Sequence, residues 1–440
     1  MGDARKAALT VLERCRRSGA WSDAVLGNVM DSAGLEERDR ALATAICYGT
    51  LQNRMLLDHI LQAASTAALN KVEPKVLDIL RISAYQLLFM EKIPASAAVN
   101  EGVKLCRALG FSRAAGYVNA VLRRLSRQHT PPELPKALAS RLSIQYSHPK
   151  WLVEALLQRL GEEEASCFLA LDNQATGIAV QVNTQKTTAE ELMDSLRADG
   201  LVCARHPVLA NCLSVQASGD LKRCAAFQKG WFYVQDAAAF FAVSAAGIQK
   251  GQRILDTCAA PGGKTFAAVI CAGGDCGITS CDIHPNKLKR IQEGAERLGF
   301  GRQIHTFQVD ARNNRAEWNG QYDLVITDVP CSGLGVIRKK PDIRYKNPED
   351  FQALPALQLQ ILRNAAQYVK PGGTLLYSTC TIRTEENEAV VTHFLNESNS
   401  FHLERFYDPW EKAYTRGTLQ LWPQRHGTDG FFIAKLRKEL

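Results

Sequence analysis

Two cysteines stand at matching points of the sequence, each directly after an apolar run that is typical of a strand. Cys331 follows LVITDVP, and Cys380 follows LLYST. A thiolate that adds to carbon 6 of a pyrimidine makes carbon 5 reactive toward an electrophilic methyl group. This reaction also needs an acid near ring nitrogen 3, and Asp328, three residues before Cys331, is the candidate. The alternative role for each cysteine is that of a small buried hydrophobic residue, which is the commonest one.

A glycine-containing turn in ILDTCAAPGGKT (254–265) is the candidate cofactor loop. A phosphate-binding loop would have glycine where Cys258 stands, and the GxGxxG pattern is absent, so a ligand with little or no phosphate is indicated. S-adenosylmethionine fits, because its carboxylate suits a helix N-terminus and its ribose suits an acid after the next strand. Asp282 is the candidate for the ribose and Asp310 for the adenine, although either alone reads equally well as an ordinary loop acid.

Residues 236–440 must position these groups. Five apolar runs alternate with helical patterns there, which predicts a Rossmann-like parallel sheet with helices on both faces. Ligands of such sheets bind beyond the carboxyl ends of the strands. The sequence therefore places one set of side chains along one cleft: Asp256, Asp282, Asp310, Asp328, Cys331 and Cys380.

The rest of the chain predicts two further domains. Residues 1–128 show apolar residues at helical spacing, as in ARKAALTVLERC, and predict an all-α domain. RQHTPPELP contains three prolines, so 129–135 is predicted to be a linker. Residues 136–235 predict a small α/β domain, in which a capping box from Thr187 to Glu190 opens a helix that ends at Gly200.

Composition limits the class of protein. The net charge is +8, and residues 1–130 hold 18 Lys and Arg against 12 Asp and Glu, which suggests either a polyanionic partner or a solvated helical surface. The thirteen cysteines lack metal-site spacing, so we expect no metal. No signal peptide or membrane-spanning run is evident, which predicts a cytoplasmic protein that does not engage a membrane.

The motifs DTCAAPGGKT, DVPCSG and YSTCT, in this order, resemble those of the NOL1/NOP2/Sun family of RNA cytosine-5 methyltransferases. RKKPDIRY (338–345) and the ending HGTDGFFIAKLRK also match, and the resemblance covers about residues 140–440. The basic helical front resembles the NusB-like RNA-binding domain of the Sun/Fmu branch. That branch methylates bacterial small-subunit ribosomal RNA.

The resemblance implies roles for the two thiols. Cys380 is the expected nucleophile and Cys331 assists product release, whereas DNA cytosine methyltransferases attack with the cysteine of the PC motif. Residue chemistry alone does not choose between these assignments. Val329 departs from the usual Ala or Pro and is expected to add bulk near the target base. The implied cofactor contacts are Cys258, Ala259, Ala260, Pro261, Gly262, Gly263, Lys264, Asp282, Asp310 and Asp328.

The sequence thus predicts an S-adenosylmethionine-dependent enzyme that methylates carbon 5 of one cytosine in 16S ribosomal RNA. Arg338, Lys339 and Arg344 are the predicted RNA contacts, because they follow the catalytic loop and accompany Tyr345. The alternatives are a cytosine-5 methyltransferase for tRNA or DNA, and a catalytically silent RNA-binding assembly factor. We expect a monomer that acts on naked RNA or an early assembly particle.

Overall fold

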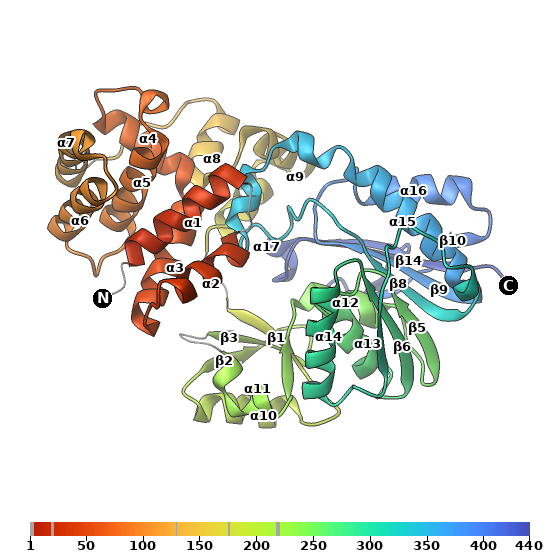
Figure 1. Ribbon diagram of the computed structural model, residues 1–440. Coiled ribbons are helices and arrows are strands. Elements are labelled where there is room, and N and C mark those ends of the chain that lie inside the picture. Colours follow the sequence, from red (N-terminus) through yellow and green to blue (C-terminus); the bar gives the residue numbers. More distant parts are fainter. Residues whose placement is uncertain (1–3, 19–21, 129, 175–176, 217–220) are drawn as a thin grey trace. The chain divides into compact units, whose positions relative to one another are not determined.

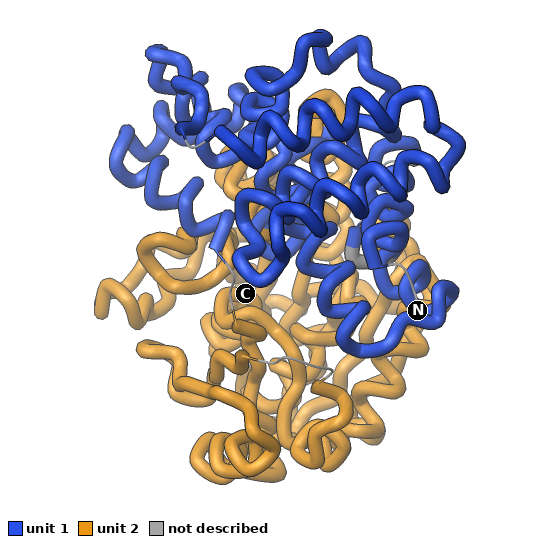
Figure 2. The backbone as a smooth tube through the Cα atoms, turned by 90° about the vertical axis from the view of Figure 1, so that its left-hand side faces the viewer, with its two compact units in different colours: residues 1–175, 337–346 blue, residues 176–336, 347–440 orange. Residues whose placement is uncertain are grey.

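The chain divides into two compact units in the computed structural model, which describes residues 4–18, 22–128, 130–174, 177–216 and 221–440. The first unit comprises residues 1–175 and 337–346, and the second comprises residues 176–336 and 347–440 (Figure 2). This division by contacts differs from the predicted domain boundaries, which remain a prediction. His129, the first residue of the predicted linker, lies outside the described residues.

The first unit is built from helices, because apolar residues recur at helical spacing and pack into one core (Figure 1). Ala8 and Val11 of the first helix and Leu122 of the seventh are fully buried there. Gly161 interrupts the last helix with a φ of 79°, a conformation that glycine adopts without strain. The helices are α1 (Ala4–Ser18), α2 (Ser22–Ser32), α3 (Glu37–Gln52), α4 (Arg54–Ala64), α5 (Pro74–Phe89), α6 (Ala95–Ala108), α7 (Ala115–Arg127), α8 (Leu138–Tyr146) and α9 (Lys150–Leu171), with the 3-10 turns η1 (Leu69–Lys71) and η2 (Ser112–Ala114).

The second part of the first unit comes from much later in the chain. Residues 337–346, which contain the 3-10 turn η5 (Pro341–Tyr345), belong to this unit, although the catalytic domain predicted from the sequence surrounds them. Tyr345 packs against the helical core and its hydroxyl donates to the carbonyl oxygen of Leu51 at 2.6 Å.

The second unit begins with a small antiparallel sheet of order β2-β3-β1-β4. Its helix α10 (Ala189–Ala198) has a capping box formed by Thr188 and Glu191, one residue later than the sequence predicts. The prediction fails by one position because the neighbouring Thr187 has the same hydroxyl and also donates to Glu191. The remaining elements are β1 (Ile178–Val182), β2 (Val202–Arg205), β3 (Cys212–Gln216), β4 (Phe232–Val234), η3 (Leu221–Arg223), α11 (Ala225–Gln228) and α12 (Ala237–Ala245).

A larger mixed sheet follows, and all five strands predicted from apolar runs are present in it. Strands β9, β8, β5, β6 and β7 are parallel in this spatial order, and β14 pairs with β9 in the antiparallel sense. The strands are β5 (Gln252–Asp256), β6 (Cys276–Asp282), β7 (Ile304–Gln308), β8 (Tyr322–Asp328), β9 (Val369–Thr379), β10 (Phe401–Leu403), β13 (Thr418–Leu421) and β14 (Phe431–Lys438); β11 (Tyr407–Asp408) and β12 (Ala413–Tyr414) form a separate pair.

Helices cover both faces of the larger sheet, as predicted (Figure 1). Ile254 of β5 packs with α12, α13 and α14, whereas the next residue, Leu255, packs with α15 and α16 on the other face. Both faces are therefore apolar, which leaves the strand ends for chemistry. The helices are α13 (Gly263–Cys271), α14 (Pro285–Leu298), α15 (Leu354–Tyr368), α16 (Glu388–Glu397) and α17 (Pro423–His426), with the 3-10 turns η4 (Ala316–Trp318) and η6 (Pro348–Phe351).

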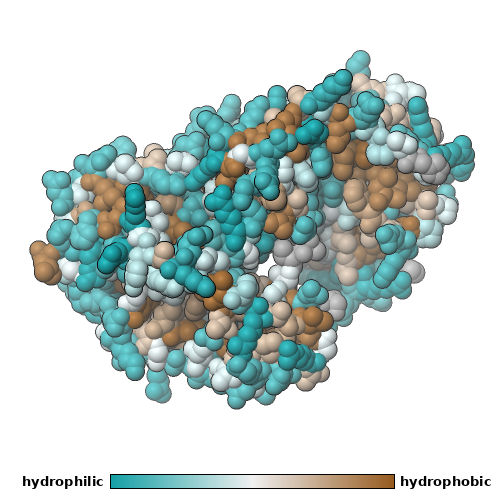
Figure 3. Space-filling view, turned by 180° about the vertical axis from the view of Figure 1, so that it is seen from behind, coloured by the Kyte–Doolittle hydropathy of each residue, from teal (hydrophilic) through white to brown (hydrophobic). Residues whose placement is uncertain are grey.

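Hydrophilic residues cover much of the face drawn in Figure 3, with hydrophobic ones gathered in smaller patches. Within the described residues, no helix has both the length and the apolar character needed to cross a membrane.

Candidate active site

The candidate cofactor loop joins β5 to α13, as the sequence predicts. Gly262 precedes the helix with a φ of 111°, and a Cβ atom there would lie 2.7 Å from the Phe266 ring, so only glycine fits without rearrangement. Thr265 donates its hydroxyl to Asp256 at 2.8 Å. Asp256 is fully buried at the end of β5, and burial raises its pKa to about 7.

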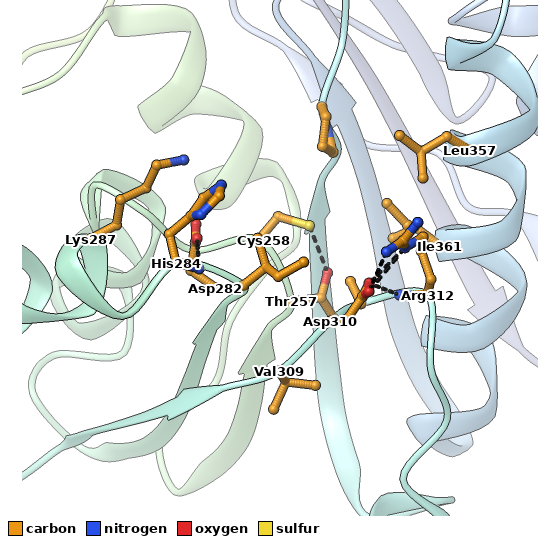
Figure 4. A pocket seen from close by; sticks show the side chains of 13 residues that line it. Thr257, Cys258, Asp282, His284, Lys287, Val309, Asp310, Arg312, Leu357 and Ile361 are labelled. Carbon is orange, nitrogen blue, oxygen red and sulfur yellow. Dashed lines mark hydrogen bonds and ion pairs between the residues drawn. The ribbon is translucent and has the colours of Figure 1, made fainter. Parts of the chain in front are cut away.

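A cavity of about 360 Å³ lies beyond the ends of β5, β6 and β7 (Figure 4). Cys258, Asp282 and Asp310 line it, as the sequence predicts for cofactor contacts. Leu357 and Ile361, one helical turn apart on α15, add an apolar wall. Two acids and an apolar wall suit a ligand that combines ribose hydroxyls with an aromatic base. The complete lining is Thr257, Cys258, Asp282, Ile283, His284, Lys287, Val309, Asp310, Ala311, Arg312, Pro330, Leu357 and Ile361.

The two acids of this cavity are held differently. Asp282 accepts a hydrogen bond from the backbone N–H of His284 at 2.8 Å. Asp310 accepts from the backbone and the guanidinium of Arg312, at 3.0 and 2.6 Å, and these hydrogen bonds hold the pKa of Asp310 below its usual value (Figure 4). Arg312 thus covers the carboxylate that the sequence assigns to the adenine.

The remaining predicted cofactor residues form the loop itself. Ala259, Ala260, Pro261, Gly262 and Gly263 connect the cavity-lining Cys258 to the start of α13 and are not among the side chains that line the cavity. Their place next to Cys258, at the N-terminus of a helix, is compatible with main-chain contacts to a carboxylate.

Asp328 and Lys264 form an ion pair apart from the cavity lining. The Nζ atom of Lys264 lies 2.6 Å from Oδ2 of Asp328, and Ser378 donates its hydroxyl to Oδ1 at 2.9 Å. The Lys264 side chain is nearly buried, whereas that of Asp328 is 32% exposed, so the carboxyl remains accessible to a substrate. Pro330, two residues later, is part of the cavity wall, so the site of Asp328 adjoins the cavity.

The two predicted catalytic thiols meet directly. Strands β8 and β9 are parallel neighbours in which Asp328 stands opposite Ser378, so the segments that follow them leave the sheet side by side. The Sγ atoms of Cys331 and Cys380 are 3.3 Å apart and both residues are partly exposed free thiols. The hydrogen bond with Cys380, together with burial and the negative charges of Glu386 and Asp328, raises the pKa of Cys331 well above its usual value.

Beyond the two thiols, the backbones at Gly335 and Gly430 approach each other closely. Gly335 donates its N–H to the carbonyl oxygen of Cys380 at 3.0 Å and accepts from Gly430 at 2.8 Å. A Cβ atom on Gly335 would lie 1.8 Å from the Gly430 carbonyl oxygen, so glycine is required. The C-terminal motif HGTDGFF thus supports the segment that carries Cys380.

Two predictions about neighbouring residues need correction. Val329 does not add bulk beside a base, because it is 3% exposed and packs in the core under α15. Arg344 is 1% exposed, and its guanidinium donates to main-chain carbonyls, including those of Gln52 and Ser147, at 3.0 and 3.1 Å. A side chain buried in this way is not available to RNA. Arg338 and Lys339 are partly exposed and remain proposed RNA contacts.

Several site residues escaped the sequence analysis. The sequence could have indicated Arg312, since a cation two residues after a predicted ligand acid can fold back and bind that acid. The sequence does not distinguish Leu357 and Ile361 as ligand contacts, because an apolar pair at helical spacing looks like any core face. The part of the chain that the structure describes contains no group of three His, Cys, Asp or Glu residues that could hold a metal ion.

Three family models match the chain in succession. The model of the NusB family matches residues 2–127. A ferredoxin-like domain model described as Methyltr_RsmF/B-like matches residues 148–222. The model described as 16S rRNA methyltransferase RsmB/F matches residues 244–437, which contain all the cavity and thiol residues described above.

Individual proteins match over nearly the whole chain. A probable ribosomal RNA small subunit methyltransferase B of Bacillus subtilis (strain 168) is 36% identical over 99% of this chain and 98% of its own length. The ribosomal RNA small subunit methyltransferase B of Vibrio cholerae is 34% identical over 94% of this chain and 93% of its own length. The crystal structure of PH0851 aligns with a TM-score of 0.84 at 26% identity and covers 100% of this chain and 99% of that one.

Proposed function

Because this chain belongs to the RsmB/F family of 16S ribosomal RNA methyltransferases, we propose that it transfers a methyl group from S-adenosylmethionine to carbon 5 of a cytosine in small-subunit ribosomal RNA. Membership of the family makes the chain a ribosomal RNA methyltransferase. The position that is methylated and the covalent route are the proposal.

The observation that carries the proposal is the pair of thiols. A methyltransferase that acts on a nitrogen or oxygen atom needs no nucleophile, because the acceptor has its own lone pair. Carbon 5 of cytosine has none, and addition of a thiolate at carbon 6 supplies the missing electron density. Cys380 and Cys331, 3.3 Å apart beside the acid Asp328, match this requirement.

The cavity fits the proposed cofactor. Its volume of about 360 Å³ lies within the range for small-molecule sites, and its acids and apolar wall match a nucleoside. Cys258, Asp282 and Asp310 would hold the nucleoside part, and the backbone from Ala259 to Gly263 the carboxylate. Bound there, S-adenosylmethionine supplies an electrophilic methyl group.

The chain's own residues then have distinct tasks. Cys380, as a thiolate, adds to carbon 6 of the base. Asp328 stabilises the protonated ring at nitrogen 3, and Ser378 and Lys264 hold its two oxygens in place. After methyl transfer, the carbon 5 proton leaves to a base and the bond from carbon 6 to sulfur breaks. Cys331, whose sulfur lies 3.3 Å from that of Cys380, assists this release.

The test uses total RNA from cells that lack the protein, incubated with radiolabelled S-adenosylmethionine and wild type, Cys380→Ala or Cys331→Ala. Protein–RNA adducts that survive a denaturing gel are measured, together with 5-methylcytosine in separated ribosomal RNA and tRNA. We expect Cys331→Ala to accumulate an adduct on small-subunit ribosomal RNA and Cys380→Ala to form none. The reverse pattern would mean that Cys331 attacks, as in DNA enzymes, and a parallel reaction with DNA would test that alternative.

A further inference from the structure

A buried glutamate lies close to the two thiols and takes part in none of the chemistry assigned above. Glu386 is fully buried and follows Cys380 by six residues, in the connection from β9 to α16. Its Oε2 atom accepts from the backbone N–H of Ser332 at 2.8 Å and from the Gln358 side chain at 2.9 Å. A buried carboxylate is costly unless it is well hydrogen-bonded, so these contacts define its place.

The contacts of Glu386 fall on both sides of Cys331. Ser332 directly follows this cysteine, and Gln358, which bonds to Glu386, also donates to the carbonyl oxygen of Pro330 at 2.9 Å. The Ser332 hydroxyl lies 2.7 Å from that of Thr381, the residue after Cys380. The short segment that carries Cys331 is therefore fastened at each end to the segment that carries Cys380.

The attacking groups are held by other residues. Asp328 is oriented by Lys264 and Ser378, and the carbonyl oxygen of Cys380 accepts from Gly335. None of these contacts passes through Glu386. Removal of its carboxylate should therefore disturb Cys331 more than the machinery that attacks the base.

The negative charge of Glu386, like its hydrogen bonds, acts on Cys331. Arg383 is a cationic partner of Glu386, and its guanidinium lies 3.4 Å from the other carboxylate oxygen. The negative charge contributes to raising the pKa of Cys331, behind the hydrogen bond with Cys380 and burial. The same group thus fixes where the Cys331 thiol lies and favours its protonated form.

We propose that Glu386, acting with Gln358, is the positioning residue for release of the methylated RNA, because it holds the Cys331 thiol against the Cys380 sulfur. This inference rests on the proposed covalent mechanism and deepens it. Glu386 touches neither substrate nor cofactor and acts through Cys331.

The experiment compares Glu386→Gln with Glu385→Gln. The second variant makes the same chemical change one residue earlier, where the carboxylate is 63% exposed and lies 3.6 Å from Arg383. Both are reacted with total RNA from cells that lack the protein, and adduct formation and decay are followed on denaturing gels. We expect Glu386→Gln to form the adduct at the wild-type rate and release it about 10- to 100-fold more slowly, since small displacements of a reacting group have effects of this size.

A second measurement needs no RNA. Iodoacetamide labelling of Cys331 and Cys380, followed by mass spectrometry over a range of pH, reports the thiolate fraction of each. Cys331 should be labelled at lower pH in Glu386→Gln than in wild type, whereas Glu385→Gln should leave its profile unchanged. A general loss of structure would instead expose cysteines in the core, such as Cys281, to the reagent.

The outcomes separate this inference from the function on which it rests. Release at the wild-type rate in Glu386→Gln would overturn the positioning role and leave the proposed function intact. Absence of any adduct or methylated RNA with wild type and Cys331→Ala would overturn the proposed function, and an unchanged labelling profile of Cys331 would then overturn the inference as well. If Glu386→Gln does not fold, Gln358→Leu removes the second half of the same contact and should also delay release.

Discussion

The pair of thiols in the second unit and a cluster of buried and partly buried polar residues in the first both contain ionisable groups, yet they serve opposite purposes. We call the latter the anchor cluster; it consists of Arg344, Tyr345, His148, Asp172 and Asn173. Arg344 follows Cys331 by only 13 positions in the sequence. The comparison shows how structure, rather than residue type, separates a reactive group from a structural one.

In the anchor cluster, most polar groups have a partner, and Nε of Arg344 and Oδ1 of Asp172 are the buried atoms without one among the cluster's side chains. Arg344 donates to main-chain carbonyls and to Asn173, Tyr345 donates to Leu51, and His148 lies 3.2 Å from Asp172. Contacts of this kind join distant segments of the fold and are typical of buried polar groups with a structural role.

The thiol pair shows the opposite arrangement. Cys331 and Cys380 are partly exposed, and each sulfur has the other as its hydrogen-bond partner. Groups that are exposed, coupled to each other and fixed by neighbours are the ones from which catalysis is expected.

The sharpest test of this contrast is Cys380→Ser. We expect the rate of RNA methylation to fall by about 10⁴-fold or more, because loss of a nucleophile removes the whole covalent route. Thermal unfolding should remain close to that of wild type, since the side chain is partly exposed. Cys167→Ser, which changes an exposed cysteine of the first unit, is the control. A Cys380→Ser enzyme that retains methylation would show that this pair is not the reacting one.

The matching change in the anchor cluster is Arg344→Met. Removal of the guanidinium leaves buried carbonyls without a donor and should destabilise the helical unit by about 3–5 kcal/mol, as loss of one partner from a buried ionic contact does. Faster hydrogen exchange in peptides from α3 and α8 would report this, whereas the exposed Arg113→Met should change little. If Arg344→Met is as stable as wild type but binds RNA more weakly, the original assignment of Arg344 to RNA is restored.

Asp328→Asn tests a residue that shares features of the anchor cluster and of the thiol pair. Asp328 is ion-paired, and its side chain is also partly exposed. We expect a loss of about 100-fold in single-turnover methylation, the lower end of the range for general acid catalysis. The fold should survive, because the side chain is 32% exposed. The exposed Asp350→Asn provides the control. Unchanged methylation by Asp328→Asn would remove this acid from the mechanism.

Much of the site was predictable because its residues lie where strands end. The five apolar runs and their polar ends placed Asp282, Asp310, Asp328, Cys331 and Cys380 at one edge of a parallel sheet, as found. The spacing of apolar residues and the lengths of the apolar runs suffice for this placement of the site residues, since the carboxyl ends of parallel strands share an edge.

The failures arose where a contact joins segments far apart in the sequence. RKKPDIRY reads as a basic surface segment, but Arg344 reaches Gln52 and Ser147, and no local pattern reveals such partners. Glu386 is one acid among several in TEENE, and its burial and its contacts with Ser332 and Gln358 distinguish it from the exposed Glu385.

The smallest expected effect concerns the response of the anchor cluster to pH. Burial lowers the pKa of His148 to about 4, and the charge of Arg344 acts in the same direction, although Asp172 and the Tyr146 carbonyl oppose both. In the unfolded chain the pKa of histidine is about 6.5, so the unfolded state binds the proton more readily. Stability is therefore full above pH 6.5 and is lost as the pH falls toward 4.

Between pH 6.5 and 5 the helical unit should lose about 2 kcal/mol of unfolding free energy through this group. Urea unfolding at several pH values measures the loss, and His148→Gln should remove most of this slope. His393→Gln, which changes an exposed histidine of the second unit, should retain it. If the slope persists in His148→Gln, the histidine is already protonated in the folded protein beside Asp172, and the anchor cluster is an ionic contact rather than a neutral one.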